Sequence, residues 1–309
     1  MTGIVEAEGV TKRYGEVLGL NGFSATFPPG ITGLVGPNGA GKSTFFRLLA
    51  GQLRCDAGKL TLLGNPAWGQ GEFRRRVGYC PEGAALFDWM TGEDFVTTLL
   101  RVDGFSRAEA VERARRAIAS VGLTDASRRR IQVYSKGMRQ RIKLAQCIAH
   151  DPALVLLDEP LNGVDPAGRA SLSALMRKLS AEGHHVIVSS HVLYEVERLT
   201  DQIVMIANGR TIAEGDLHRI RELIDERPHV IDITTPDPRG LARLLGDWDH
   251  VVSIEFRGPD HLRALTKSPD AFYAALPGLV VAESIAVLEV HSADDNLDAV
   301  FRYLSEGTR

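Results

Sequence analysis

The segment GPNGAGKST, residues 36–44, places a lysine and hydroxyl residues after spaced glycines, in the pattern G-x-x-x-x-G-K-[ST]. An apolar run, ITGLVG, leads into it, and TFFRLLAG continues it with the pattern of a helix. Glycines let successive backbone N–H groups point at a polyphosphate, and a helix N-terminus adds its dipole. We therefore expect Lys42 to reach the β- and γ-phosphates and Ser43 to bind Mg²⁺. The alternative is a glycine-rich turn that matches by chance.

A pair of acidic residues supplies the second chemical element, in the segment LVLLDEP at 154–160. Asp158 ends an apolar run, where a carboxylate can hold the ligand shell of Mg²⁺. Glu159 follows it and is placed to polarise an attacking water as a general base. Taken alone, two acidic residues at the end of a strand could be a capping feature. Beside a phosphate cradle they indicate hydrolysis of a nucleotide.

Buried parallel strands are expected to position these groups. Short apolar runs alternate with helical patterns, and the clearest strands are 31–36, 153–160 and 184–191. The first 30 residues and GKLTLLGNP (58–66) predict shorter strands at an antiparallel edge. We therefore expect an α/β protein with the core of a P-loop NTPase, a mostly parallel sheet with an antiparallel β edge.

Two further segments differ from this core. Residues from about 88 to 150 read as helices and predict a helical insertion. Beyond a core domain at 1–224, we expect a small C-terminal α+β accessory domain at 225–309. Its predicted strands are HVIDITT (229–235), VVSIEF (251–256) and VLEVHS (287–292), followed by an amphipathic helix at 294–304.

The composition excludes several classes of function. A chain of 309 residues with a net charge of −3 gives no electrostatic reason to expect nucleic acid as a partner. Three scattered cysteines argue against a disulfide framework and against a zinc site. The N-terminus lacks the pattern of a signal peptide, and no apolar run is long enough to cross a bilayer. Work at a membrane would therefore require another chain to provide the membrane-spanning part.

Three more motifs complete a pattern. These are YSKGMRQR (134–141), which we call the signature segment, LNGVDP (161–166), and SSH (189–191). Together with the phosphate cradle and the acidic strand, and in this order, they resemble the ATP-binding subunits of ABC transporters over roughly residues 4–220.

The resemblance implies a composite site between two chains. Tyr14, in TKRYG, would stack on adenine, and His191 would contact the γ-phosphate and fix the water and Glu159. Ser135 and Gly137 would contact the γ-phosphate of ATP held by the opposite subunit, although Ser135 could also cap the helix that follows it. Two chains would sandwich two ATP molecules head to tail, so we expect a second copy or a similar partner.

Site residues follow from the motifs. The expected catalytic residues are Glu159, His191 and Lys42, and the expected ligands of Mg²⁺ are Ser43, Glu82 and Asp158. The residues expected to bind ATP are Tyr14, Gly36, Pro37, Asn38, Gly39, Ala40, Gly41, Lys42, Ser43, Thr44, Glu82, Ser135, Lys136, Gly137 and Asp165. The expected cofactors are therefore ATP and Mg²⁺.

Two residues of the signature segment depart from the commonest pattern of the family, since Lys136 replaces a glycine and Met138 a glutamine. This variant resembles the branch that serves ABC-2 type exporters. There the permease is a separate integral membrane protein, and the ATPase, peripheral at the cytoplasmic face of the cell membrane, often carries a C-terminal extension. The alternatives are a soluble ABC-type ATP switch acting on ribosomes or DNA, and a degenerate cassette that serves as a scaffold.

The segment VGYCPE (77–82) places Glu82 where this family usually carries a glutamine that contacts Mg²⁺ and the attacking water. A carboxylate is at least as good a ligand for a hard cation as an amide oxygen. When ionised, however, it cannot donate a hydrogen bond. Our hypothesis is that Glu82 makes the engagement of its loop more dependent on bound Mg²⁺. The alternative is a solvated turn residue.

Overall fold

The computed structural model describes residues 3–67, 75–83, 86–217, 220 and 228–292. The chain divides into two compact units, unit 1 (residues 1–216) and unit 2 (residues 217–309). Among the described residues, none of the helices combines the length and the apolar composition that crossing a membrane requires.

Unit 1 contains both strands and helices. Its strands are β1 (Val5–Tyr14), β2 (Val17–Phe27), β3 (Ile31–Val35), β4 (Ala57–Leu62), β5 (Asn65–Pro66), β6 (Val77–Cys80), β7 (Leu154–Asp158), β8 (His185–Ser190), β9 (Gln202–Ala207) and β10 (Arg210–Asp216). Its helices are α1 (Lys42–Leu49), α3 (Gly92–Val102), α4 (Arg107–Ser120), α5 (Lys136–Ile148), α6 (Pro166–Ala181) and α7 (Leu193–Glu197), with short 3-10 turns η1 (Thr124–Ala126) and η2 (Ile131–Val133).

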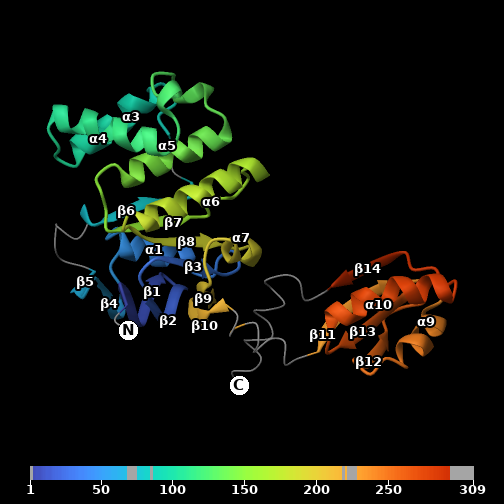
Figure 1. The fold of residues 1–309 in the computed structure, drawn as a ribbon. Coiled ribbons are helices and arrows are strands. Elements are labelled where there is room, and N and C mark those ends of the chain that lie inside the picture. Colours follow the sequence, from blue (N-terminus) through green and yellow to red (C-terminus); the bar gives the residue numbers. More distant parts are fainter. Residues whose placement is uncertain (1–2, 68–74, 84–85, 218–219, 221–227, 293–309) are drawn as a thin grey trace. The chain divides into compact units, whose positions relative to one another are not determined.

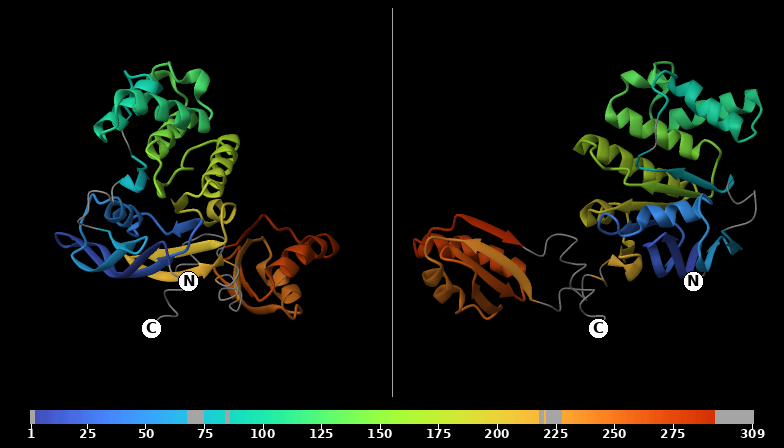
Figure 2. Two further views of the ribbon diagram at one scale, coloured as in Figure 1. Left: turned by 60° about the vertical axis from the view of Figure 1, so that its left-hand side comes forward. Right: turned by 180° about the vertical axis from the view of Figure 1, so that it is seen from behind.

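The central sheet of unit 1 has the strand order β10-β9-β3-β8-β7-β6. Its five strands from β9 to β6 pair in parallel, and β10 is the antiparallel edge. A second, antiparallel sheet has the order β2-β1-β4-β5. Figure 1 shows the helical group α3, α4 and α5 at one end of unit 1 and strands β1 and β2 at the other, and Figure 2 shows the same order from two more sides.

The central sheet separates two hydrophobic cores. Successive side chains of β7 point to opposite faces, as the pleat requires. Val155 and Leu157 join the core formed with helices α3 to α6, whereas Leu154 and Leu156 join the core that contains α1 and the antiparallel sheet. All five residues of β7 are buried, which explains why its first four residues are apolar without alternation.

The aromatic residue Phe45 of α1 lies at the centre of the second core. It is fully buried, and its ring centroid lies 4.9 Å from that of Phe23 and 5.2 Å from that of Phe27, both on β2. Helix α1 begins at the phosphate cradle. Packing of these rings therefore fixes the helix that carries Lys42 against the antiparallel sheet.

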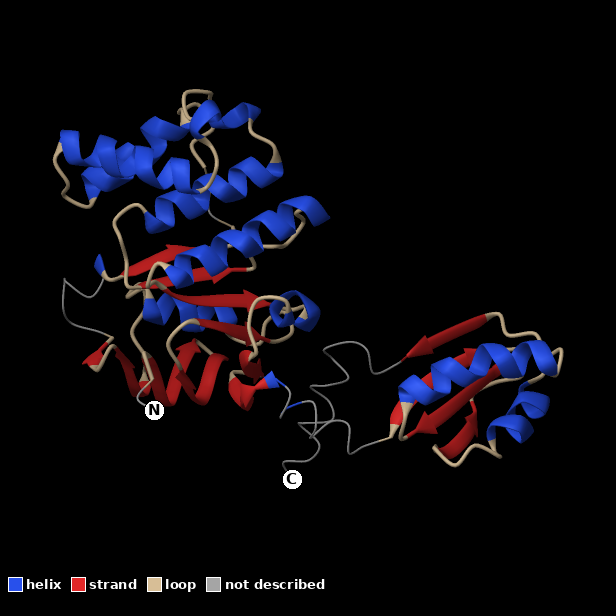
Figure 3. Ribbon diagram, viewed as in Figure 1, coloured by secondary structure: helices blue, strands red, loops and turns tan. Residues whose placement is uncertain are grey.

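Unit 2 contains strands β11 (His229–Thr234), β12 (Val251–Phe256), β13 (His261–Thr266) and β14 (Glu289–Ser292), and helices α9 (Pro238–Leu245) and α10 (Pro269–Ala282). The strands form an antiparallel sheet in the order β12-β13-β11-β14. A β-α-β-β-α-β sequence with this order is the ferredoxin-like arrangement. Figure 3 shows α9 and α10 beside this sheet.

Alternation along the strands of unit 2 separates its core from its outer face. Ile231 and Ile233 of β11 are buried with residues of both helices. On the other face Asp232 accepts two hydrogen bonds from Arg263, from Nε at 2.7 Å and from Nη2 at 2.8 Å. These bonds to the guanidinium hold the pKa of Asp232 below its usual value.

The structure confirms the predicted fold class, including the antiparallel edge, the helical insertion between β6 and β7, and an α+β C-terminal region. The strands of the antiparallel edge are longer than expected, since β1 has 10 residues and β2 has 11. Strand β13 was not predicted, because Arg263 interrupts its short apolar pattern. The domain limits 1–224 and 225–309 stay a prediction, and the expected helix at 294–304 lies outside the described residues.

We expect Phe45→Ala to lower the free energy of unfolding by about 3–5 kcal/mol, because it removes a buried ring and leaves a cavity between α1 and β2. Urea denaturation of the full chain measures this change. The matched control is Phe87→Ala, at a ring that is 46% exposed, which should cost less than about 1 kcal/mol. Equal losses in the two variants would contradict the central place of Phe45.

Candidate functional site

Four loops follow adjacent parallel strands and meet at one edge of the central sheet. The register pairs Val35 with Ser190, Asp158 with Ser189, and Cys80 with Leu157. The phosphate cradle follows β3, the acidic pair ends β7, the histidine follows β8, and the Glu82 loop follows β6. Because the carboxyl ends of parallel strands share an edge, the motifs that the sequence singled out come from neighbouring strands.

The cradle requires glycine at two positions. A Cβ atom at Gly36 would lie 2.2 Å from the carbonyl oxygen of Ile206. Gly41 has a φ of +113°, and a Cβ there would lie 2.5 Å from the carbonyl oxygen of Gly19. Close backbone packing therefore requires glycine at both positions, and at Gly41 the left-handed conformation requires it as well. Asn38 and Gly39 form the exposed crest of the loop, whereas Ala40 is buried.

Helix α1 starts without a side-chain cap. Gly41 is its N-cap residue and provides no side chain to accept from the first turn. By contrast, Thr91, Ser106, Ser135 and Asp165 cap α3, α4, α5 and α6 through their side chains. The first N–H groups of α1, which include those of Ser43 and Thr44, therefore need an acceptor from elsewhere. An anionic phosphate fits this position.

Lys42 is the buried cation of the site. Its Nζ donates to the carbonyl oxygens of Gly36 at 2.6 Å and Pro37 at 3.2 Å. The same atom lies 3.1 Å from Glu159 Oε1, and the two side chains are only 6% and 7% exposed. Glu159 Oε1 is buried and accepts no well-directed hydrogen bond, so this contact is a charge pair. The cradle thus holds the ammonium directly against the acidic pair.

Ser189 organises the acidic pair. Its hydroxyl donates to Asp158 Oδ1 at 2.7 Å and accepts from the backbone N–H of Glu159 at 2.9 Å. Tyr79 donates a long bond of 3.4 Å to Asp158 Oδ2, and burial followed by the charge of Asp158 raises the pKa of Tyr79. One hydroxyl therefore orients one acidic side chain and the backbone of the next.

Glu159 and His191 are in contact. Nδ1 of His191 lies 2.9 Å from Glu159 Oε2, and the carboxylate accepts, so Nδ1 carries the proton in this bond. The backbone of Glu159 has a φ of +49°, a strained conformation for a residue with a side chain. The bond from its N–H to Ser189 and the two contacts of its carboxylate hold this conformation. Glu159 is thus fixed at three points.

Tyr14 ends β1 near the cradle. A Cβ at Gly19 would lie 2.8 Å from the Tyr14 ring and 3.1 Å from Thr44, so both side chains border the same glycine. The Tyr14 ring is 41% exposed, and part of its surface is open to a planar partner. The structure therefore brings Tyr14 to the end of the phosphate cradle.

Glu82 is exposed and has defined partners. Its Oε1 accepts from Nδ2 of Asn162 at 2.8 Å, and its carbonyl oxygen accepts from Nζ of Lys143 at 3.0 Å. Asn162 lies in LNGVDP, the loop after the acidic strand. The Glu82 loop is thus joined to the loop that follows Glu159 and to helix α5 of the helical insertion.

The signature residues have local roles in one protomer. Ser135 accepts from the N–H of Met138 at 3.3 Å and caps α5, as the capping alternative predicted. Lys136 lies against Gly163, and Gly137 has open space on its Cα. Asp165 caps α6 by accepting from the N–H of Gly168 at 2.8 Å. In the described part of the chain, no hydrogen bond or ion pair joins Ser135, Lys136 or Gly137 to residues 36–44.

Two buried thiols lie beside the site. Burial raises the pKa of Cys80 to about 12, and burial also raises the pKa of Cys147. Both therefore stay protonated and act as small apolar groups.

Sequence reasoning missed Ser189 and Asn162 as site residues. Both stand inside motifs that it had quoted, and only the register of the strands and the loop contacts reveals their partners.

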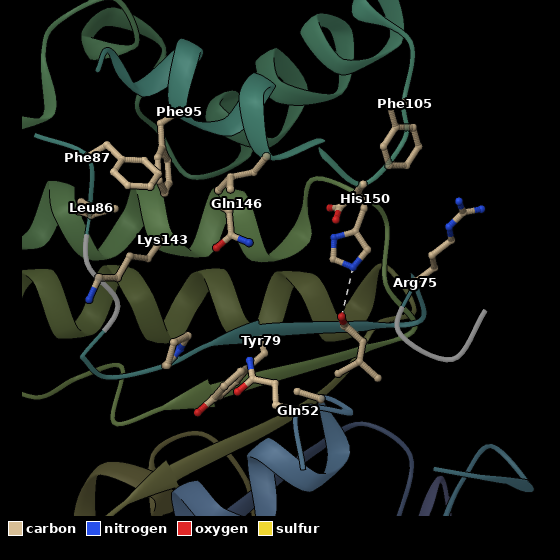
Figure 4. Close-up of a pocket in the computed structure, with 15 residues that line it drawn as sticks. Gln52, Arg75, Tyr79, Leu86, Phe87, Phe95, Phe105, Lys143, Gln146 and His150 are labelled. Atoms are coloured by element: carbon tan, nitrogen blue, oxygen red, sulfur yellow. Dashed lines mark hydrogen bonds between the residues drawn. The ribbon is translucent and has the colours of Figure 1, made fainter. Parts of the chain in front are cut away.

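A cavity of about 790 Å³ opens between the sheet and the helical insertion. Figure 4 shows Phe87 and Phe95 on the side of the helices and Tyr79 and Gln52 on the side of the sheet, with Lys143 between them. Among its lining residues, Nε2 of His150 lies 3.3 Å from the carbonyl oxygen of Val77, and burial lowers the pKa of His150. The cavity thus reaches the strand that leads to Glu82.

Comparisons with known proteins agree with this geometry. Residues 20–162 match the family described as ABC transporter. The chain is 33% identical to the daunorubicin/doxorubicin resistance ATP-binding protein DrrA of Streptomyces peucetius, over 98% of this chain and 93% of that protein. It is 34% identical to the Nod factor export ATP-binding protein I of Rhizobium sp. (strain N33), over 89% of this chain and 90% of that protein.

A solved structure shares the fold. The dimeric structure of MJ0796, a bacterial ABC transporter cassette, superposes with a TM-score of 0.62 at 23% identity, covering 69% of this chain and 98% of that one. At this identity the likeness supports the fold alone. The two relatives, similar over nearly their full length, establish the family. The chain therefore belongs to the ATP-binding subunits of ABC transporters, and it is an ABC transporter ATPase.

Proposed function

We propose that this subunit energises an ABC-2-like exporter, through ATP-driven closure of a dimer and Mg²⁺-dependent hydrolysis. The observation that carries the proposal is the state of Glu159, which is buried, strained and in contact with Lys42 on one oxygen and His191 on the other. Export is supported by the names of two relatives that span nearly the whole chain, which refer to drug resistance and to Nod factor export.

Binding of ATP would redistribute the charges of the site. The triphosphate would accept from the uncapped N–H groups of α1 and from Lys42. Lys42 would then divide its charge between Glu159 and the phosphates, which loosens the hold of the ammonium on the carboxylate. Tyr14 would stack on the adenine.

The oxygen atoms at this edge fit a hard divalent cation. The hydroxyl of Ser43 and the carboxylates of Asp158 and Glu82 are the candidate ligands, and oxygen ligands are what Mg²⁺ prefers. Bound there, Mg²⁺ would neutralise charge on the β- and γ-phosphates. Ser189 already donates to Oδ1 of Asp158. Oδ2 accepts a weak hydrogen bond from Tyr79 and would be available to the metal or to its water shell.

Glu159 would act as the general base for hydrolysis. Its carboxylate would accept a proton from the attacking water as the oxygen of that water bonds to the γ-phosphorus and the bond to the β-phosphate oxygen breaks. His191 would hold the base through Nδ1 and would lie beside the γ-phosphate. Ser189 would keep the base aligned through the backbone N–H.

A second copy would complete the site. Ser135, Lys136 and Gly137 lie at the N-terminus of α5, where a helix dipole favours an anion. Lys136 adds a positive charge, and its side chain is exposed. Across a head-to-tail dimer these residues would face the γ-phosphate bound by the partner subunit. Closure would then depend on the γ-phosphate, and hydrolysis would release it.

The cavity beside the Glu82 loop would receive a separate permease. Phe87 lines this cavity and Trp89 lies beside Phe87, with ring centroids 6.2 Å apart, and the two residues are 46% and 70% exposed. Exposed aromatic side chains next to a groove are typical of surfaces that bind a partner helix. Docking there would place the subunit at the cytoplasmic face of the membrane and would connect the permease to the strand leading to Glu82.

We expect Glu159→Gln to lower the rate of ATP hydrolysis at least about 100-fold, because the water loses its base. The contacts to nucleotide persist, so the variant should accumulate as an ATP-bound dimer, measured by size-exclusion chromatography with ATP. Lys42→Ala is the control and should lose both turnover and ATP-dependent dimerisation. A Glu159→Gln variant that hydrolyses ATP at the wild-type rate would contradict the assigned base.

We expect Glu82→Gln to weaken the dependence of activity on Mg²⁺, because the carboxylate adds negative charge near the γ-phosphate when the metal is absent. The activity at limiting Mg²⁺, as a fraction of that at saturation, should rise roughly two- to five-fold, which corresponds to about 0.5–1 kcal/mol. Asn162→Ala is the control, since it removes the bond to Glu82 but keeps the charge. Identical Mg²⁺ titrations of wild type and Glu82→Gln would reject the hypothesis.

We expect affinity purification of the tagged chain from detergent-solubilised membranes to recover one integral membrane permease. The exposed aromatic residues Phe87 and Trp89 should be part of that contact, so Trp89→Ala should recover less of it. Recovery of ribosomes or DNA in place of a membrane protein would overturn the exporter proposal and support a soluble switch.

A further inference from the structure

An ion pair outside the sequence motifs, between a largely buried glutamate and an arginine whose side chain is 44% exposed, connects two of the segments that form the site. Glu195 lies on α7, and its side chain is 10% exposed. Its Oε1 is 2.8 Å from Nη1 of Arg169, which lies on α6. Its Oε2 accepts from the hydroxyl of Ser190 at 3.1 Å. Both carboxylate oxygens are therefore used, and they join α6 to the end of β8.

At one end of this network, the side chain of Ser190 connects the two residues that flank His191 in the sequence. The Ser190 hydroxyl donates to Glu195 and accepts from the backbone N–H of Val192 at 3.0 Å. The residues on both sides of His191 are thus tied together by one side chain. Since His191 holds Glu159 through Nδ1, the turn that Ser190 and Val192 form sets the position of that contact.

The Arg169 end of the network holds the loop 161–166. Nε of Arg169 donates to the carbonyl oxygen of Val164 at 2.8 Å, while its Nη1 holds Glu195. A planar guanidinium fixes two acceptors at a set geometry, which an ammonium cannot reproduce. The same loop carries Asn162, which binds Glu82, and Gly163, which lies against Lys136.

We propose that Arg169 and Glu195 are positioning residues that hold the turn of His191 against the loop 161–166. The alignment of His191 with Glu159 then depends on the place of that loop, which also contacts Glu82 and Lys136. Through this pair, displacement of the loop on dimer closure or on engagement of the Glu82 loop reaches the general base within the same subunit. The inference rests on the roles of Glu159 and His191 proposed above.

The test compares Glu195→Gln, Arg169→Met and the double variant in the full-length protein. We expect each single variant to lower kcat for ATP about ten- to 100-fold, because misplacing a catalytic group by ~1 Å costs about that much. KM for ATP should stay within about twofold of wild type. The double variant should lose no more than the worse single variant, because the two residues act as one unit.

Two controls separate positioning from general stability. The exposed pair Lys178, on the same helix α6, and Glu182, the C-cap residue of that helix, lies 3.8 Å apart, and Lys178→Met with Glu182→Gln should leave kcat unchanged. Placed in the Glu159→Gln background, Glu195→Gln should still permit the ATP-dependent dimer. Loss of that dimer, or a rise in KM parallel to the fall in kcat, would overturn the proposal in favour of a structural role.

His191→Ala, measured in parallel, shows whether a negative result contradicts the positioning pair or the proposed role of His191 itself. An inactive His191→Ala beside wild-type kcat in Glu195→Gln and Arg169→Met would overturn the positioning pair alone. Wild-type activity in His191→Ala would overturn the role of His191 and, with it, the purpose assigned to the pair. Additive losses in the double variant would also overturn the proposal, since independent residues do not form a network.

Discussion

The ammonium of Lys42 and the carboxylate of Glu159 lie 3.1 Å apart where water scarcely reaches either. Charges at that depth are tolerated only as partners, so the fold must deliver both from different elements to one point. Lys42 opens α1 after β3, and Glu159 follows β7. The order β3-β8-β7 places the ends of these strands at one edge and puts Ser189 and His191 between them. The two cores then fix the supports, with α1 on one face of the sheet and α6 on the other.

The carboxylate of Glu159 contacts a cation with one oxygen and an imidazole with the other, and its backbone is held in a strained conformation. In the function proposed above, a triphosphate would compete for the cation and would leave the imidazole in place. On that proposal the alignment of Glu159 for hydrolysis would depend on the nucleotide, and the network from Ser190 through Glu195 to Arg169 would extend that dependence to the loop 161–166.

Sequence reasoning recovered the parts that local pattern determines. The cradle motif, the buried strands and the helical insertion all follow from residue type and period, and the fold class was predicted correctly. It could not find pairs whose partners are distant in the chain, such as Glu82 with Asn162 or Arg169 with Glu195, because loop packing sets those contacts. Ser135 shows the opposite case, since its capping role was available from spacing alone. Strand β13 escaped because a strand with one buried face and a central arginine leaves a weak signal.

The uncapped N-terminus of α1 would couple nucleotide binding to the stability of the rest of unit 1. Four other helices are closed at their N-termini by their own side chains, and α1 is not. Its first turn is therefore an unfinished piece of secondary structure, which the bound nucleotide would complete. Part of the binding energy then becomes local folding energy in a helix whose Phe45 packs on β2. A bound nucleotide would in this way complete the first turn of α1, and its release would leave the N–H groups of that turn without an acceptor again.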